Sequence, residues 1–111
     1  MLIFHGGNSQ EFEASPDLME AHMGKWMAWI EKLRQNDHYL AGEPLLPGGK
    51  LITGKKKTVT DGPYTEGKEI VGGYFIIQAK NYDEAVQLCD DYPDFDHGGS
   101  IQVRQVMKIE M

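Results

Sequence analysis

The segment Ile70–Ile77 constrains the fold of this chain more than any other. Apart from two glycines, its residues are β-branched or aromatic, which is typical of a buried strand. The four bulky side chains from Tyr74 to Ile77 are consecutive, so they point to both faces of the strand. A strand with one face in water would alternate apolar and polar residues. We therefore expect a central strand whose sheet is covered on both faces.

The residues before this strand predict a strand–helix–strand unit. The apolar run Leu2–Phe4 predicts a first strand, which Gly6 and Gly7 end. Ser15 and Pro16 are typical of a helix start. Apolar residues then recur at the helical spacing of three or four, and these are Met19, Met23, Trp26, Met27, Ile30 and Leu33. We expect a helix over residues 16–35, followed by a short strand over residues 38–41. We expect the core to be filled by Met19, Met23 and Met27 together with Trp26 and Trp29.

A second unit of the same kind follows the central strand. Asn81 and Glu84 have the spacing of a helix-capping pair and predict a helix that ends before Pro93. Gly98 and Gly99 predict a turn, and alternating apolar residues over 101–109 predict a final strand.

A small hairpin is predicted between the two units, with arms Leu51–Thr53 and Thr58–Thr60 around Gly54. The order of elements predicts an α+β fold in one domain over residues 1–111. It is a ferredoxin-like βαβ-βαβ antiparallel sheet with a hairpin insertion. Two helices cover only one face of such a sheet. We therefore expect a homodimer, paired sheet to sheet, in which burial of each bulky side chain contributes about 1.5–3 kcal/mol.

Composition limits the partners of the chain. Its 111 residues carry a net charge of −6, which argues against nucleic acid and anionic membranes because phosphate binding requires a basic surface. The one basic run, Lys55–Lys57, is predicted to be a solvated strand edge.

Cellular location follows from the N-terminus and the single cysteine. The N-terminus lacks the pattern of a signal peptide, and no apolar stretch is long enough to span a membrane. Cys89 is the only cysteine, so we expect no internal disulfide and a cytoplasmic location. We expect Cys89 to be inert core packing.

His22 is the first candidate for chemistry. Lys25 and Trp26 follow it by three and four residues, so the three side chains share one face of the predicted helix. A histidine between an aromatic ring and a cation is a candidate general base. The alternative is a histidine at the helix edge that bonds a loop carbonyl.

The segment Asp61–Glu66 is the second candidate. Asp61 is followed by Gly62 and Pro63, which together predict a rigid turn into the central strand. A rigid turn is a good mount for the functional groups of Asp61, Tyr64 and Glu66, although the turn can equally be structural.

An acidic cluster is the third candidate, and it consists of Asp90, Asp91, Asp94, Asp96 and His97. It lacks the ligand spacing of a calcium loop and the several His or Cys residues of a zinc site. We expect a solvated acidic turn and no metal. No Gly-rich phosphate loop, Ser-His-Asp order or Cys-x-x-Cys motif is present in the sequence, so we expect no cofactor.

Four stretches carry a resemblance to a known family, and they are Gly42-Glu43, residues 59–74, Asp83–Ala85 and Gly99–Arg104. Together they resemble the YCII-related family, and within it the branch named for an Asp-Gly-Pro-Phe motif, with Tyr64 in the place of the Phe. The resemblance implies a ferredoxin-like fold that forms a dimeric α/β barrel.

The resemblance also implies two kinds of function. Some relatives are similar to small lyases or dehydrochlorinases with an acid–base pair of His and Asp. Counted back from Gly42, the family histidine falls nearer Lys25 than His22, and no Asp matches its partner after Gly42. Other relatives resemble accessory proteins whose genes neighbour extracytoplasmic-function sigma factors.

Two hypotheses follow. The first is a small-molecule cleft between the long helix and the Asp61–Glu66 turn, with cofactor-independent lyase-like or dehydrochlorinase-like chemistry. His22 and Asp61 are its catalytic residues, and the substrate-binding residues are Lys25, Trp26, Glu43, Tyr64 and Glu66. The second is a non-catalytic binding or regulatory module with a protein partner, such as a sigma-factor-associated accessory protein.

Overall fold

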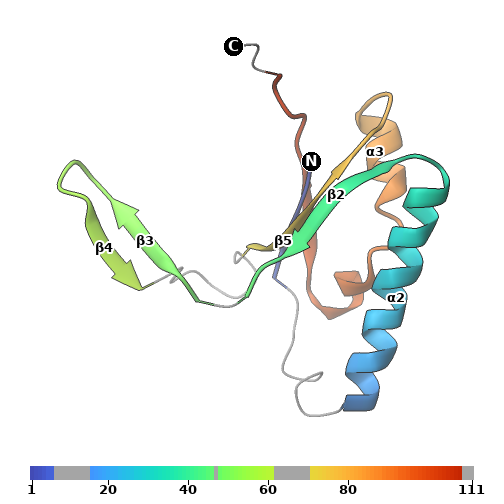
Figure 1. Cartoon of the computed structure of the whole chain (residues 1–111), viewed down its shortest axis with the longest axis horizontal. Coiled ribbons are helices and arrows are strands. Elements are labelled where there is room, and N and C mark those ends of the chain that lie inside the picture. The colour runs from blue at the N-terminus through green and yellow to red at the C-terminus, as the bar shows by residue number, and fades with distance from the viewer. Residues whose placement is uncertain (7–15, 47, 62–70, 109–111) are drawn as a thin grey trace.

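The fold is built on a four-stranded antiparallel sheet. The computed structural model describes residues 1–6, 16–46, 48–61 and 71–108. The sheet has the order β2 (Tyr39–Pro44), β5 (Val71–Ile77), β1 (Leu2–His5) and β6 (Ser100–Val103). The helices α2 (Pro16–Gln35) and α3 (Tyr82–Leu88) lie on one face of the sheet (Figure 1). This arrangement confirms the predicted α+β, ferredoxin-like fold.

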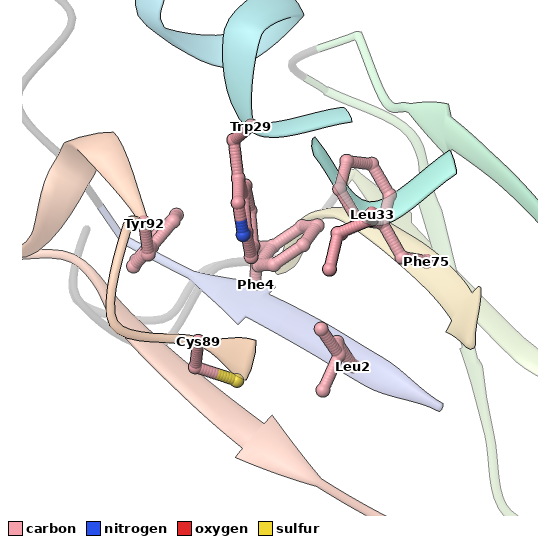
Figure 2. Packing of buried hydrophobic residues seen from close by; sticks show 7 residues of the cluster. All are labelled: Leu2, Phe4, Trp29, Leu33, Phe75, Cys89 and Tyr92. Atoms are coloured by element: carbon pink, nitrogen blue, oxygen red, sulfur yellow. The ribbon is translucent and has the colours of Figure 1, made fainter. Parts of the chain in front are cut away.

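The core lies between the sheet and the two helices, and Figure 2 shows its cluster of buried side chains: Leu2, Phe4, Trp29, Leu33, Phe75, Cys89 and Tyr92. Phe4 is at its centre. The ring of Phe4 is perpendicular to Phe75 at 4.8 Å and stacks on Tyr92 at 5.3 Å. Such pairs add about 0.5–1.5 kcal/mol beyond their buried area. Trp29 donates its Nε1–H to the Leu88 carbonyl at 2.9 Å, so its polar atom is satisfied.

The central strand β5 has side chains on both faces of the sheet, as predicted. Phe75 points to the helices and is buried, whereas the side chains of Tyr74 and Ile76 alternate with it and are half-buried. Both described helices lie on the Phe75 side. Pairing of the second face with another copy remains a prediction.

The elements differ from the predicted ones at three places. Strand β2 continues to Pro44. Because β2 is at the edge of the sheet, the backbone N–H that proline lacks is not needed to pair with another strand. Strand β6 ends at Val103, so the prediction of a strand to residue 109 was wrong over 104–108. A 3-10 helix, η2 (Pro93–His97), was not predicted, and it ends at Gly98 with a left-handed φ of 82°.

The start of α3 confirms the capping prediction. The side chain of Asn81 accepts a hydrogen bond from the backbone N–H of Glu84 at 2.9 Å. Glu84 in turn accepts from the backbone N–H of Lys80 at 3.2 Å, one residue earlier than in the usual reciprocal pair.

The methionines of α2 do not fill the core, so that prediction was wrong. Met19, Met23 and Met27 are 44–58% exposed, whereas Trp29 is 2% exposed. The reason is angular, because residues four apart drift by about 40° on a helix with 3.6 residues per turn. The tryptophans lie on the side that faces the sheet, and the methionines lie on the flank.

The predicted hairpin is present as β3 (Lys50–Thr53) and β4 (Thr58–Asp61). It projects away from the four-stranded sheet (Figure 1), and all its residues are exposed. Lys55–Lys57 form the turn at its tip rather than a strand edge, and Lys57 N–H donates to the Gly54 carbonyl at 3.1 Å.

Candidate functional site

A histidine–aspartate pair lies where α2 approaches η2. His22 is in the second turn of α2, and Asp94 is the second residue of η2. His22 Nε2 lies 2.7 Å from Asp94 Oδ1, which is hydrogen-bond distance. The two side chains are 14% and 18% exposed, so the pair is largely buried but open to solvent at its edge. We call it the His22–Asp94 pair.

Trp26 competes with Asp94 for the same nitrogen. One helical turn after His22, it donates its indole N–H to His22 Nε2 at 3.1 Å. An imidazole nitrogen carries either a proton or a lone pair. Protonated Nε2 donates to Asp94, and unprotonated Nε2 accepts from Trp26. Both forms of His22 therefore have a partner in place, which is what a group that gains and loses a proton requires.

Burial raises the pKa of the Asp94 carboxyl, although the nearby imidazoles of His22 and His97 oppose that shift. The carboxyl holds a proton more readily than one in water. Its proton affinity is thereby brought closer to that of an imidazole, and this favours proton exchange within the His22–Asp94 pair.

Gly99 positions Asp94. Its backbone N–H donates to the Asp94 carbonyl at 2.8 Å and holds the end of η2. A Cβ at position 99 would lie 2.9 Å from both Asp94 Cβ and Asp94 O, and 2.8 Å from Tyr92 Oη. Only glycine permits this close approach without movement of the 3-10 helix.

The structure brings together some of the predicted site residues and not others. His22 and Trp26 are bonded to each other, whereas Lys25 is exposed on the helix surface. Asp61 is not beside His22 but binds Lys50 across the β3–β4 hairpin, with its side chain 73% exposed.

The other predicted binding residues lie elsewhere. Glu43 in β2 accepts a hydrogen bond from the Tyr74 hydroxyl at 3.4 Å, and its charge raises the pKa of that phenol. Tyr64 and Glu66 are outside the described residues.

Asp94 is the residue that sequence reasoning missed. The prediction of a solvated acidic turn was wrong for Asp94, and it holds for Asp90 and Asp96, which are exposed. One signal could have separated them. Pro93 begins a segment of five residues that the Gly98–Gly99 pair ends, a length and composition typical of a short ordered helix rather than a free loop.

The two described hollows lie away from the His22–Asp94 pair. The larger, of about 540 Å³, is formed by the end of β5, the start of α3 and the segment after β6. It is lined by no histidine and no carboxylate, so it holds no pair like that of His22 and Asp94. Beside the pair itself, Leu18 and Met19 precede His22 by one turn and are 52% and 44% exposed. Residues three and four apart are neighbours on a helix, so we call Leu18 and Met19 the apolar rim of His22.

Among the described residues, no group of three or more His, Cys, Asp or Glu side chains is arranged to hold a metal ion. No helix in the described part of the chain is long and apolar enough to cross a membrane.

Comparison with known proteins identifies a family match. The family model of the YCII-related domain matches residues 2–110, which is nearly the whole chain. The match is to the family as a whole and does not separate its branches. No curated protein matches the chain.

Proposed function

The chain belongs to the YCII-related family, and we propose that its His22–Asp94 pair is the acid–base group of a small-molecule site. The observation that carries the proposal is the 2.7 Å contact between His22 Nε2 and Asp94 Oδ1, with Trp26 as the alternative partner of the same nitrogen. The partner of His22 in this proposal is Asp94 and not Asp61.

The chemistry is proton transfer to or from a small cyclic or aromatic compound, without a cofactor. With Nε2–H donated to Asp94, His22 takes a proton from the substrate at Nδ1, and Asp94 stabilises the imidazolium that forms. In an elimination, the same proton returns to the leaving group. The apolar rim of Leu18 and Met19 would contact the ring of the compound while its acidic proton faces the imidazole.

A thermal-shift screen tests the site. The probes are small phenols, lactones and carboxylic acids, and the proteins are wild type, His22→Gln, Asp94→Asn and the control Asp61→Asn. A compound at 100 times its Kd stabilises the fold by about 2.7 kcal/mol. For a domain near this size, this corresponds to a shift of roughly ten degrees in Tm.

The proposal expects a hit that binds wild type and Asp61→Asn and is lost in His22→Gln and Asp94→Asn. Turnover of that compound, followed by exchange of its acidic C–H in D₂O, should fall by about 10²- to 10⁴-fold in the same two variants. A hit that depends on Asp61 but not on Asp94 would refute the pairing. No hit with any probe would favour the second candidate function.

That second candidate is a non-catalytic module that binds a regulatory protein. The observation in its favour is the exposed flank of α2, because methionines are common on adaptable protein-binding surfaces. Recovery of a partner that is lost when Met23 and Met27 are both replaced by Gln would support it.

We also propose a homodimer in which the uncovered faces of two sheets pair, and the cytoplasm as the compartment. Tyr74 and Ile76 on the second face support the dimer. The buried free thiol of Cys89, with its pKa raised to about 11 by burial, is in keeping with a reducing compartment. Sedimentation of wild type and Ile76→Lys tests the dimer, because a charge on the paired face should dissociate it.

A further inference from the structure

The β3–β4 hairpin and its tip, residues 50–61, form a basic arm on an acidic molecule. The arm carries four lysines and one aspartate, which is a net charge of +3. Because the whole chain has a net charge of −6, the residues outside the arm carry −9. Lys50 is paired with Asp61 within the arm. Lys55–Lys57 at the tip are exposed and form no ion pair with any described residue.

The arm also carries apolar side chains that its own molecule leaves in water. Ile52 and Val59 face each other across the hairpin and are 63% and 58% exposed. A two-stranded hairpin in water is only marginally stable by itself, so such an arm gains from a surface to pack on.

A surface of complementary charge lies on the opposite side of the molecule. A hollow of about 200 Å³ is lined by Val86, Cys89, Asp90, Phe95, Ile101 and Val103. Half-exposed Val86 and Phe95 make it apolar. Asp90 lines it, Asp83 precedes the lining Val86 by three residues, and Asp96 follows the lining Phe95 directly. These three carboxylates are exposed and form no ion pair within the described part of the chain. We call it the acidic hollow.

The arm lies away from the acidic hollow of its own molecule. It projects from one end of the sheet away from both helices, whereas the hollow lies between α3, η2 and β6 (Figure 1). The apolar pair and the three lysines of the arm match the apolar hollow and its three carboxylates, and this separation favours a contact between two molecules.

We propose that the arm of one copy docks in the acidic hollow of a second copy, and that the two copies exchange arms reciprocally. Ile52 and Val59 pack against Val86 and Phe95, while Lys55–Lys57 meet Asp90 and Asp96. A reciprocal exchange closes the assembly at two copies. The proposal does not depend on the chemistry of the His22–Asp94 pair. The contact between arm and acidic hollow is separate from the proposed pairing of the two sheet faces, which could form without it.

Zero-length cross-linking tests the contact directly. An equal mixture of ¹⁵N-labelled and unlabelled protein is treated with a carbodiimide, which joins lysines to carboxylates in contact, and the peptides are identified by mass spectrometry. The proposal expects peptides of mixed label that join Lys55, Lys56 or Lys57 to Asp90 or Asp96. Arm lysines joined only to peptides of their own label, or to no residue of the acidic hollow, would overturn it.

Charge reversal measures the contribution of the arm to association. Lys55, Lys56 and Lys57 are replaced together by Glu, and the matched control replaces the exposed lysines Lys25, Lys80 and Lys108, so both proteins have the same net charge. By sedimentation at low salt, the dissociation constant of the arm variant should rise by about tenfold or more over that of the control. Mixing the arm variant with Asp90→Lys/Asp96→Lys should restore association.

Two results would overturn the proposal. One is equal association of the arm variant and the control. The other is that wild type shifts a DNA duplex in a gel and the arm variant does not, while the two proteins self-associate equally. The arm would then bind nucleic acid and not a second copy.

Discussion

Replacement of Gly99 by alanine should displace Asp94 and thereby weaken both the fold and the candidate site. The added Cβ would lie 2.8 Å from Tyr92 Oη and 2.9 Å from Asp94 Cβ and Asp94 O. A Cβ essentially never lies within 3.0 Å of a non-bonded heavy atom, and two of the three contacts involve atoms that move only with the backbone of η2. The 3-10 helix must therefore shift, and the 2.7 Å contact with His22 shifts with it.

The expected cost follows from this overpacking. Insertion of a methyl group into a filled site costs about 1–3 kcal/mol. At roughly 4 °C per kcal/mol for a domain near this size, Tm should fall by about 4–12 °C. Gly24 supplies the matched control, because a Cβ there meets no atom within 4 Å. Gly24→Ala lies in an exposed helix interior and should raise the free energy of unfolding by about 0.5–1 kcal/mol.

Thermal unfolding and NMR of the Asp94 amide measure the two effects together. We expect Gly99→Ala to melt below wild type and Gly24→Ala above it, with the Asp94 resonance displaced only in Gly99→Ala. If Gly99→Ala melts with wild type and the Asp94 resonance keeps its position, the argument that Gly99 positions Asp94 is wrong.

Three further perturbations follow from burial. Because burial raises the pKa of Asp94, its proton stabilises the fold fully below about pH 3.8, and that contribution is lost as pH rises through the folded pKa. Asp94→Asn cannot ionise, so in urea titrations its stability relative to wild type should rise over this range; a constant difference would contradict the burial. Leu33→Ala should cost about 2–5 kcal/mol and Met27→Ala less than about 0.5 kcal/mol, since Leu33 is 2% and Met27 58% exposed. Cys89, with a pKa of about 11, should react with a thiol reagent at pH 8 only after unfolding.

Sequence patterns predicted the elements because local chemistry decides them. The bounds of α2 follow from Pro16 and from the apolar spacing behind it, and the start of α3 follows from Asn81. The two-faced character of β5 was visible in four consecutive bulky residues. Prediction failed where burial depends on packing between elements that are distant in the sequence. The apolar stripe of α2 includes both the tryptophans and the methionines, and only packing against the sheet selects the tryptophans.

The candidate site shows the same limit. His22 and Trp26 are one helical turn apart, so their contact was predictable from the sequence. Asp94 is 72 positions from His22, and it reaches the imidazole because a 3-10 helix turns it toward α2. Charge density made the segment resemble a solvated turn, although one of its carboxylates is largely buried. The rigid turn after Asp61 led to the prediction that Asp61 lies in the site. Its pairing with Lys50 across β3 and β4 holds it on the hairpin instead.

An NMR titration of the ring nitrogens of His22 tests the central claim most directly. Two groups that share a proton titrate in coupled steps, and each reports the titration of the other. We predict that the His22 signals of wild type and Asp61→Asn follow the same steps, and that Asp94→Asn shows one step fewer. A His22 titration that is unchanged in Asp94→Asn would contradict the pairing on which the proposed function rests.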